Sequence, residues 1–175
     1  MVVISLQTVL KEKLEEKMDN LNQTLKWIDT LGDSKITIEK EIIMGTKNRG
    51  IYGIFVNDII KKTEYCAYVG RAVNIYSRFL SGKYAHFVKL KKGKLENSKI
   101  VEALNDKNKR IEVRVLENVK FNYEDYCKDT QFMASRECYY IDYYQALNQC
   151  LEQCPDGSNV RRKVWENEKM LSSKA

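Results

Sequence analysis

Apolar residues recur at steps of three and four through the highly charged first part of the chain. This spacing predicts an amphipathic helix over residues 5–31 that ends near Gly32. The apolar positions also approach a heptad seam, so the helix packs either on its own domain or against a second copy of the chain. The recurring apolar residues are Leu10, Leu14, Met18, Leu21, Leu25 and Ile28.

β-Branched and aromatic residues dominate the part that follows. Residues 50–56 and 65–70 are rich in them and flank a turn signal at Asn57-Asp58, which predicts an antiparallel hairpin. Residues 111–117 alternate between apolar and polar side chains with period two, and this predicts a third strand. A weaker alternation over residues 35–44 indicates either a strand or a connector.

Helical segments fill most of the remaining sequence. Asn74 is a candidate N-cap for a helix that Ser81-Gly82 interrupts before a second helical piece at residues 84–90. Further helices are expected around residues 98–105 and 132–147. We therefore expect an α+β fold, in which a small three-stranded antiparallel sheet is flanked by helices and an amphipathic helix is added at the N-terminus.

The same pattern divides the chain into three parts. Residues 1–45 form a helical N-terminal embellishment, residues 46–154 form the core, and residues 155–175 form a polar C-terminal tail. With one proline and no serine- or glycine-rich tract, the sequence contains no linker that would split the core into two domains.

The composition of the chain indicates which class of molecule it binds and in which compartment it is expected. The net charge of +6 and the pI of about 8.9 favour nucleic acid, because basic side chains release the counterions condensed on phosphates. No apolar run approaches the roughly 20 residues that cross a bilayer, so we expect no membrane association. Five cysteines without a disulfide-scaffold spacing fit a reducing cytosol, and a cytoplasmic location is expected.

The most informative feature is a pair of tripeptides, one on each strand of the predicted hairpin. They are Gly50-Ile51-Tyr52 and Tyr68-Val69-Gly70; Arg78 follows on the next helix, and Glu137 lies on the last one. This order resembles the GIY-YIG nuclease superfamily, with the second tripeptide in its common YVG form. The resemblance covers roughly residues 49–150 and is greatest to the stand-alone restriction-type endonucleases.

The resemblance implies a metal-dependent endonuclease that cuts double-stranded DNA and leaves 5′-phosphate and 3′-hydroxyl ends, of restriction or phage type. Arg78 corresponds to the catalytic arginine, and Glu137 to the ligand of Mg²⁺ or Mn²⁺. Tyr52 would take a proton from the attacking water if nearby cations or the metal lowered its pKa from the usual value of about 10. Tyr68 would orient that water or the phosphate.

The chain departs from the family pattern one helical turn beyond the arginine. Members often have a histidine or tyrosine there, whereas this sequence has Gly82. A break at Ser81-Gly82 would bring either Tyr84 or His86 back into the site. His86, the sole histidine, is a candidate assisting base, and a structural role is the alternative.

Further residues are candidates for binding DNA. Arg71, beside the second tripeptide, is expected to grip the scissile or an adjacent phosphate, and the other candidates are Lys83, Tyr84 and Asn148. A lysine-rich segment, Lys89 to Lys94, either contacts phosphates without sequence preference or is a solvated loop.

Cutting both strands of a duplex requires two sites, so a homodimer is expected. Two alternatives remain open at this point: a catalytically silent nucleic-acid-binding module of the same fold, and a nuclease directed at RNA.

Overall fold

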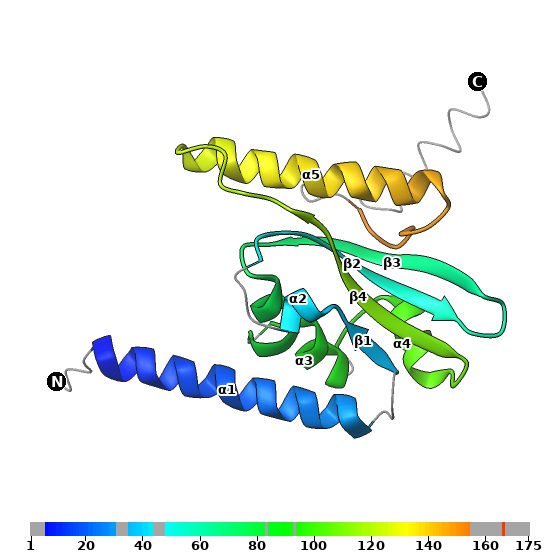
Figure 1. The fold of residues 1–175 in the computed structure, drawn as a ribbon, viewed down its shortest axis with the longest axis horizontal. Coiled ribbons are helices and arrows are strands. Elements are labelled where there is room, and N and C mark those ends of the chain that lie inside the picture. Colours follow the sequence, from blue (N-terminus) through cyan, green and yellow to red (C-terminus); the bar gives the residue numbers. More distant parts are fainter. Residues whose placement is uncertain are drawn as a thin grey trace.

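A four-stranded mixed sheet with helices on both faces organises the chain in the computed structural model (Figure 1). The structure describes residues 6–30, 35–43, 48–82, 84–92 and 94–154, together with residue 166. The predicted α+β class is confirmed. Apart from residue 166, the predicted C-terminal tail at 155–175 lies outside the described residues.

Three antiparallel strands form the centre and one edge of the sheet, as expected. They are β2 (Gly50–Asp58), β3 (Thr63–Ala72) and β4 (Lys109–Asn118), and β2 lies between the other two. Strand β3 is at the edge of the sheet.

The prediction of a three-stranded antiparallel sheet is corrected by a fourth strand. Strand β1 (Ile36–Ile38) pairs in parallel with β4 over Ile111 to Val113. It lies in the segment that we assigned to the N-terminal embellishment, so part of that segment belongs to the sheet. The weak alternation over residues 35–44 left a strand possible there, but it could not identify the partner, because parallel pairing joins segments across a long crossover rather than a tight turn.

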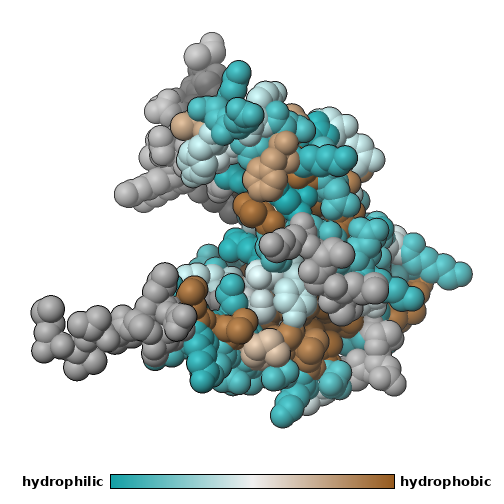
Figure 2. All heavy atoms as spheres, turned by 60° about the vertical axis from the view of Figure 1, so that its left-hand side comes forward, coloured by the Kyte–Doolittle hydropathy of each residue, from teal (hydrophilic) through white to brown (hydrophobic). Residues whose placement is uncertain are grey.

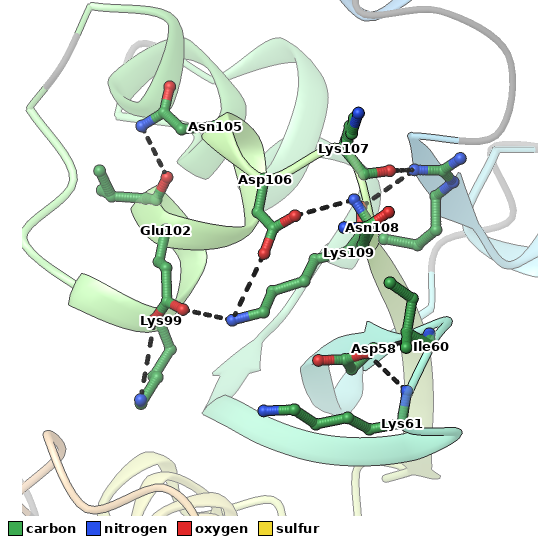
Figure 3. Close-up of polar contacts among 12 residues, drawn as sticks. Asp58, Ile60, Lys61, Lys99, Glu102, Asn105, Asp106, Lys107, Asn108 and Lys109 are labelled. Atoms are coloured by element: carbon green, nitrogen blue, oxygen red, sulfur yellow. Dashed lines mark hydrogen bonds and ion pairs between the residues drawn. The ribbon is translucent and has the colours of Figure 1, made fainter.

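The end of the sheet at the β2–β3 turn is held by short polar contacts. The Asp58 carboxylate accepts hydrogen bonds from the amides of Ile60 (3.1 Å) and Lys61 (2.9 Å). At the same end, Lys109 pairs with Glu102 and Asp106, which ties helix α4 to the start of β4 (Figure 3). The two tripeptides lie toward the opposite end of the hairpin, because Gly50 pairs with Ala72 there.

One face of the sheet is covered by several short helices and by the long N-terminal one (Figure 1). These elements are α1 (Leu6–Thr30), α2 (Lys40–Ile43), η1 (Ser77–Ser81), α3 (His86–Lys91) and α4 (Ser98–Asn105). Burial of apolar surface between them and the strands stabilises this layer. The buried cluster includes Tyr52, Ile54, Phe79, Leu80, Phe87, Ile111 and Val113.

Helix α5 (Tyr126–Ala146) covers the opposite face (Figure 1). It begins earlier than predicted, because the Asp125 side chain caps it by accepting a hydrogen bond from the amide of Lys128 (2.8 Å). A second buried cluster joins it to the sheet: Ile51, Phe55, Val69, Met133 and Ile141. The two core clusters thus lie on opposite faces of the sheet.

The second half of α1 packs on the rest of the molecule. Leu21 and Trp27 contact the first core cluster, and Thr24 is buried. Toward the N-terminus, Leu10 (57% exposed) and Leu14 (61%) remain in solvent, and Figure 2 shows apolar side chains at the surface along this helix. Packing on its own domain therefore accounts for only part of the apolar stripe.

Among the described residues, no helix combines the length and the apolar character that crossing a membrane requires.

Candidate active site

The glycines of the two tripeptides are required by close approaches within the sheet. Gly70 lies opposite Tyr52 in the β2–β3 register, and a Cβ atom at Gly70 would lie 2.5 Å from Cζ and Oη of Tyr52. A Cβ atom at Gly50 would overlap the backbone carbonyl of Glu117 on β4. Gly70 therefore leaves room for the ring of Tyr52 on the neighbouring strand. Gly50 lets the backbones of β2 and β4 approach each other closely.

The two tyrosines and the single histidine form one aromatic cluster. Tyr52 is fully buried, and its hydroxyl shares a 2.8 Å hydrogen bond with Nε2 of His86. The ring of Tyr68 lies 5.1 Å from that of His86 and 6.2 Å from that of Tyr52, between centroids. Phe79 packs edge-on against Tyr52, with centroids 4.6 Å apart, and also contacts the ring of His86.

The predicted break at Ser81-Gly82 brings His86 into this cluster. The Asn74 side chain accepts a hydrogen bond from the amide of Ser77 (3.0 Å) and starts the short π-helical turn η1, which carries Arg78. At Gly82 the chain leaves the turn, and α3 begins at His86. Tyr84, the other candidate, is 66% exposed and lies instead beside a hollow with Arg71 and Arg78.

A cavity of about 210 Å³ lies at the edge of the sheet that β3 forms. Its wall contains Tyr68 and Arg71 from β3, Arg78 from η1 and Glu137 from α5. The Arg71 guanidinium contacts the Glu137 carboxylate at 2.7 Å. Although η1 and α5 cover opposite faces of the sheet, their side chains meet around its edge. Tyr52 lies behind Tyr68 and is not part of this wall.

The loop after α5 completes the wall and was not anticipated. The Gln153 side chain accepts a hydrogen bond from the amide of Val69 (2.9 Å) and donates one to the carbonyl of Val69 (2.5 Å). The Gln149 side chain accepts one from the amide of Cys66 (2.7 Å). These amides cover the exposed backbone of an edge strand as another strand would. The sequence offers no signal for this, because a glutamine amide can pair with any backbone edge.

Burial changes the proton affinity of the cluster. It raises the pKa of Tyr52 and of Tyr68, and the charge of Arg78 beside both phenols only partly opposes the shift. Burial, followed by the charges of Arg78 and Lys89, lowers the pKa of His86 to about 3. At neutral pH both phenols are protonated and the imidazole is neutral. The lowered pKa on which the predicted role of Tyr52 depends is therefore not found in the protein alone.

Of the remaining DNA-binding candidates that the structure describes, Arg71 lines the cavity and Asn148 does not. Asn148 occupies the left-handed conformation (φ 57°) in the turn after α5, and its amide donates a hydrogen bond to the carbonyl of Gln145. Its backbone therefore terminates the helix. Lys83 lies outside the described residues.

The donor set of the cavity fits a hard divalent cation held by few protein ligands. Glu137 is a carboxylate at the cavity wall, and the described part of the chain contains no group of three or more histidine, cysteine, aspartate or glutamate side chains that could enclose a metal. Mg²⁺ commonly takes one or two carboxylates and keeps several waters, so a single glutamate is compatible with it.

Comparisons with protein-family models, with curated proteins and with solved structures give no match to this chain.

Proposed function

We propose that the protein is a divalent-metal-dependent endonuclease of the GIY-YIG type, of restriction or phage origin, that hydrolyses phosphodiester bonds in double-stranded DNA. The supporting observation is that Tyr68, Arg78 and Glu137, which come from three different elements, line one small cavity. A phenol, a guanidinium and a carboxylate at one edge of a sheet suit in-line attack of water on a phosphodiester.

Arg78 stabilises the transition state of hydrolysis more than it stabilises the bound substrate. A phosphodiester gains negative charge as it becomes pentacovalent, and a fixed guanidinium beside it stabilises that state more than the substrate. Arg71 presents a second guanidinium to the same cavity, held in place by Glu137. Each guanidinium is a planar fork of N–H donors that can form two parallel hydrogen bonds with phosphate oxygens.

Glu137 would hold Mg²⁺ or Mn²⁺. When bound, such an ion supplies Lewis-acid stabilisation to the phosphate oxygens. The carboxylate also keeps Arg71 oriented toward the cavity, so its removal would disturb both the cation site and the phosphate grip.

Tyr68 is the phenol that contacts the attacking water in this proposal, because it lines the cavity and Tyr52 does not. As a neutral phenol it accepts a hydrogen bond from the water and orients it. Tyr52 acts behind it as a positioning residue and shares its proton with His86. A bound phosphate would offset the charges of Arg78 and Lys89, which raises the pKa of His86 and makes the imidazole a better proton acceptor.

Cleavage of plasmid DNA with Mg²⁺ or Mn²⁺ tests the proposal. We expect the wild type to cut, and Arg78→Ala and Glu137→Ala to lose at least about 100-fold in rate, the usual effect of removing one charge-stabilising group. Arg110→Ala and Glu124→Ala, which remove the same charges outside this cavity, serve as matched controls. Sequencing the cut ends reports the stagger and any recognition site.

Intact plasmid with both metals would overturn the proposal. Shifted bands without cutting would then identify a silent binding module, and cleavage confined to a parallel RNA substrate would identify an RNA nuclease.

We also propose that the active form is a homodimer, since one cavity per chain cuts one strand at a time. Support comes from the apolar side chains that α1 leaves in solvent, among them Leu10, Leu14 and Met18.

A further inference from the structure

A second, larger cavity adjoins the candidate active site. It measures about 480 Å³ and shares Tyr68, Arg78 and Gln153 with the smaller cavity. Its far wall is formed by α3 and by the loop that leads to α4, through His86, Lys89 and Lys94. A group bound in one cavity would therefore be separated from a group in the other by Tyr68, Arg78 and Gln153.

The fold directs two lysines of the lysine-rich segment to this cavity and others elsewhere. Lys89 lies one helical turn after His86 and therefore faces the same side of α3. The backbone amide of Lys94 donates to the carbonyl of Lys89 (2.8 Å), which folds the loop back and brings Lys94 to the same wall. The ammonium group of Lys91 instead donates to a carbonyl of Gln23 on α1 (3.3 Å).

The cations in the wall of this cavity outnumber its carboxylates, because Arg78, Lys89 and Lys94 lie there with Glu96 and Glu152. Within the described part of the chain, neither Lys89 nor Lys94 is within ion-pair distance of a carboxylate. Glu152 is also in the wall, but its carboxylate accepts hydrogen bonds from the amide (2.7 Å) and the hydroxyl of Ser98 at the start of α4. The lowered pKa of His86, caused first by burial and then by Arg78 and Lys89, reflects the same field.

The wall is also held in a defined shape. The Asn97 side chain donates to the carbonyl of Ala67 on β3 (2.9 Å) and accepts from the amide of Ile100 (3.1 Å). These bonds fasten the loop between α3 and α4 to the strand that carries Tyr68. Lys89 on α3 and Lys94 on the fastened loop are thus held in place, which suits recognition of an anion at a definite distance from Arg78.

We propose that this cavity binds the backbone phosphate next to the scissile one, with Lys89 and Lys94 as its ligands and Arg78 between the two phosphates. The inference rests on the proposed nuclease function and names its substrate class: a polynucleotide that carries a further phosphate on the Lys89 side, in preference to an isolated phosphodiester. Lysine suits this role as a point charge that needs no exact geometry.

A binding cycle tests the assignment independently of catalysis. Short DNA duplexes with one backbone phosphate at a time replaced by an uncharged methylphosphonate are bound to the wild type, Lys89→Ala and Lys94→Ala without added metal. Fluorescence anisotropy gives each Kd. In the wild type we expect one position to weaken binding about tenfold, as loss of one charge-assisted contact would. In either lysine variant the same replacement should weaken binding clearly less, because one of the two ligands of that phosphate is already absent.

The control is Lys61→Ala, which removes the same charge from the β2–β3 turn at the other end of the hairpin (Figure 3). It should retain the full effect of the replacement. Equal sensitivity to every methylphosphonate in the wild type and in both cavity variants would overturn the assignment.

Cleavage of the same duplexes separates this inference from the proposed function. If the wild type cuts and the sensitive phosphate adjoins the cut bond, both stand. If it cuts and the sensitive phosphate lies elsewhere, the cavity assignment falls and the nuclease remains. If no duplex is cut, the nuclease proposal falls, and with it the assignment of this phosphate as a neighbour of a scissile bond.

Discussion

The ring of Tyr52 occupies the space that any side chain at position 70 would need, because Gly70 lies directly opposite it in the hairpin. We predict that Gly70→Ala displaces the Tyr52 hydroxyl from His86 and lowers the cleavage rate at least about tenfold, since a misplacement near 1 Å has effects of that size or larger. Steady-state cleavage and thermal unfolding are measured together.

Gly53→Ala is the matched control for this change. A Cβ atom at Gly53 would lie 2.5 Å from the ring of Phe55, which packs in the second core cluster rather than in the aromatic cluster. Both variants are therefore strained, but only Gly70→Ala should lose activity beyond its loss of stability. Equal activity in the two variants would show that the position of Tyr52 is unimportant.

His86 gives a direct test of the buried cluster, because it is the only histidine in the sequence. Its pKa is lowered to about 3 by burial and by the nearby charges of Arg78 and Lys89. We predict that its imidazole NMR signals do not shift between pH 8 and pH 5, whereas a solvated histidine titrates near about 6.5. A midpoint above pH 6 would contradict the buried placement.

The same residue makes stability depend on pH. In the unfolded chain the imidazole binds a proton below about pH 6.5, while in the folded protein it stays neutral down to about pH 3. His86 has no effect on stability above that window, and its penalty grows as the pH falls through it. Between pH 7 and pH 4.5 we expect a loss on the order of 2–3 kcal/mol from this group.

Urea unfolding of the wild type and of His86→Gln at the two pH values measures this loss. Glutamine does not titrate, so the variant should lose less stability on acidification. The contribution of carboxylates cancels in the comparison. Parallel behaviour of the two proteins would contradict the prediction.

Gln153 should stabilise the folded protein in addition to lining the cavity. Its side chain makes two hydrogen bonds with the backbone of Val69, and truncation leaves an edge-strand amide and carbonyl uncovered. We predict that Gln153→Ala lowers the free energy of unfolding by about 2 kcal/mol, from two bonds of about 1 kcal/mol each. Gln23→Ala, at an exposed position of α1, should leave it unchanged within about 0.5 kcal/mol.

The exposed half of α1 predicts self-association. We expect the wild type to elute as a dimer in size-exclusion chromatography with light scattering, and Leu14→Lys with Met18→Lys to elute as a monomer, because lysine cannot be buried in an apolar seam. Glu12→Gln with Asp19→Asn changes the net charge equally on other faces of the helix and should remain dimeric. A wild type that is monomeric at every concentration would contradict the prediction.

Much of the local structure was predictable because short-range chemistry determines it. The hairpin follows from its β-branched residues and turn, and the helical break follows from Asn74 and Gly82. The grouping of Tyr68, Arg78 and Glu137 was expected only through the family resemblance, since no spacing in the sequence measures the distance between a strand and a helix on the opposite face.

The amino-acid sequence was enough to predict the hairpin, the third antiparallel strand and most of the helices, because these depend on neighbours a few residues away. Tertiary packing decided the rest: β1 joined β4, His86 rather than Tyr84 met Tyr52, and Gln153 covered the edge of β3. Each of these contacts joins residues far apart in the chain, and its free energy depends on burial and on backbone groups left unpaired once the sheet has formed.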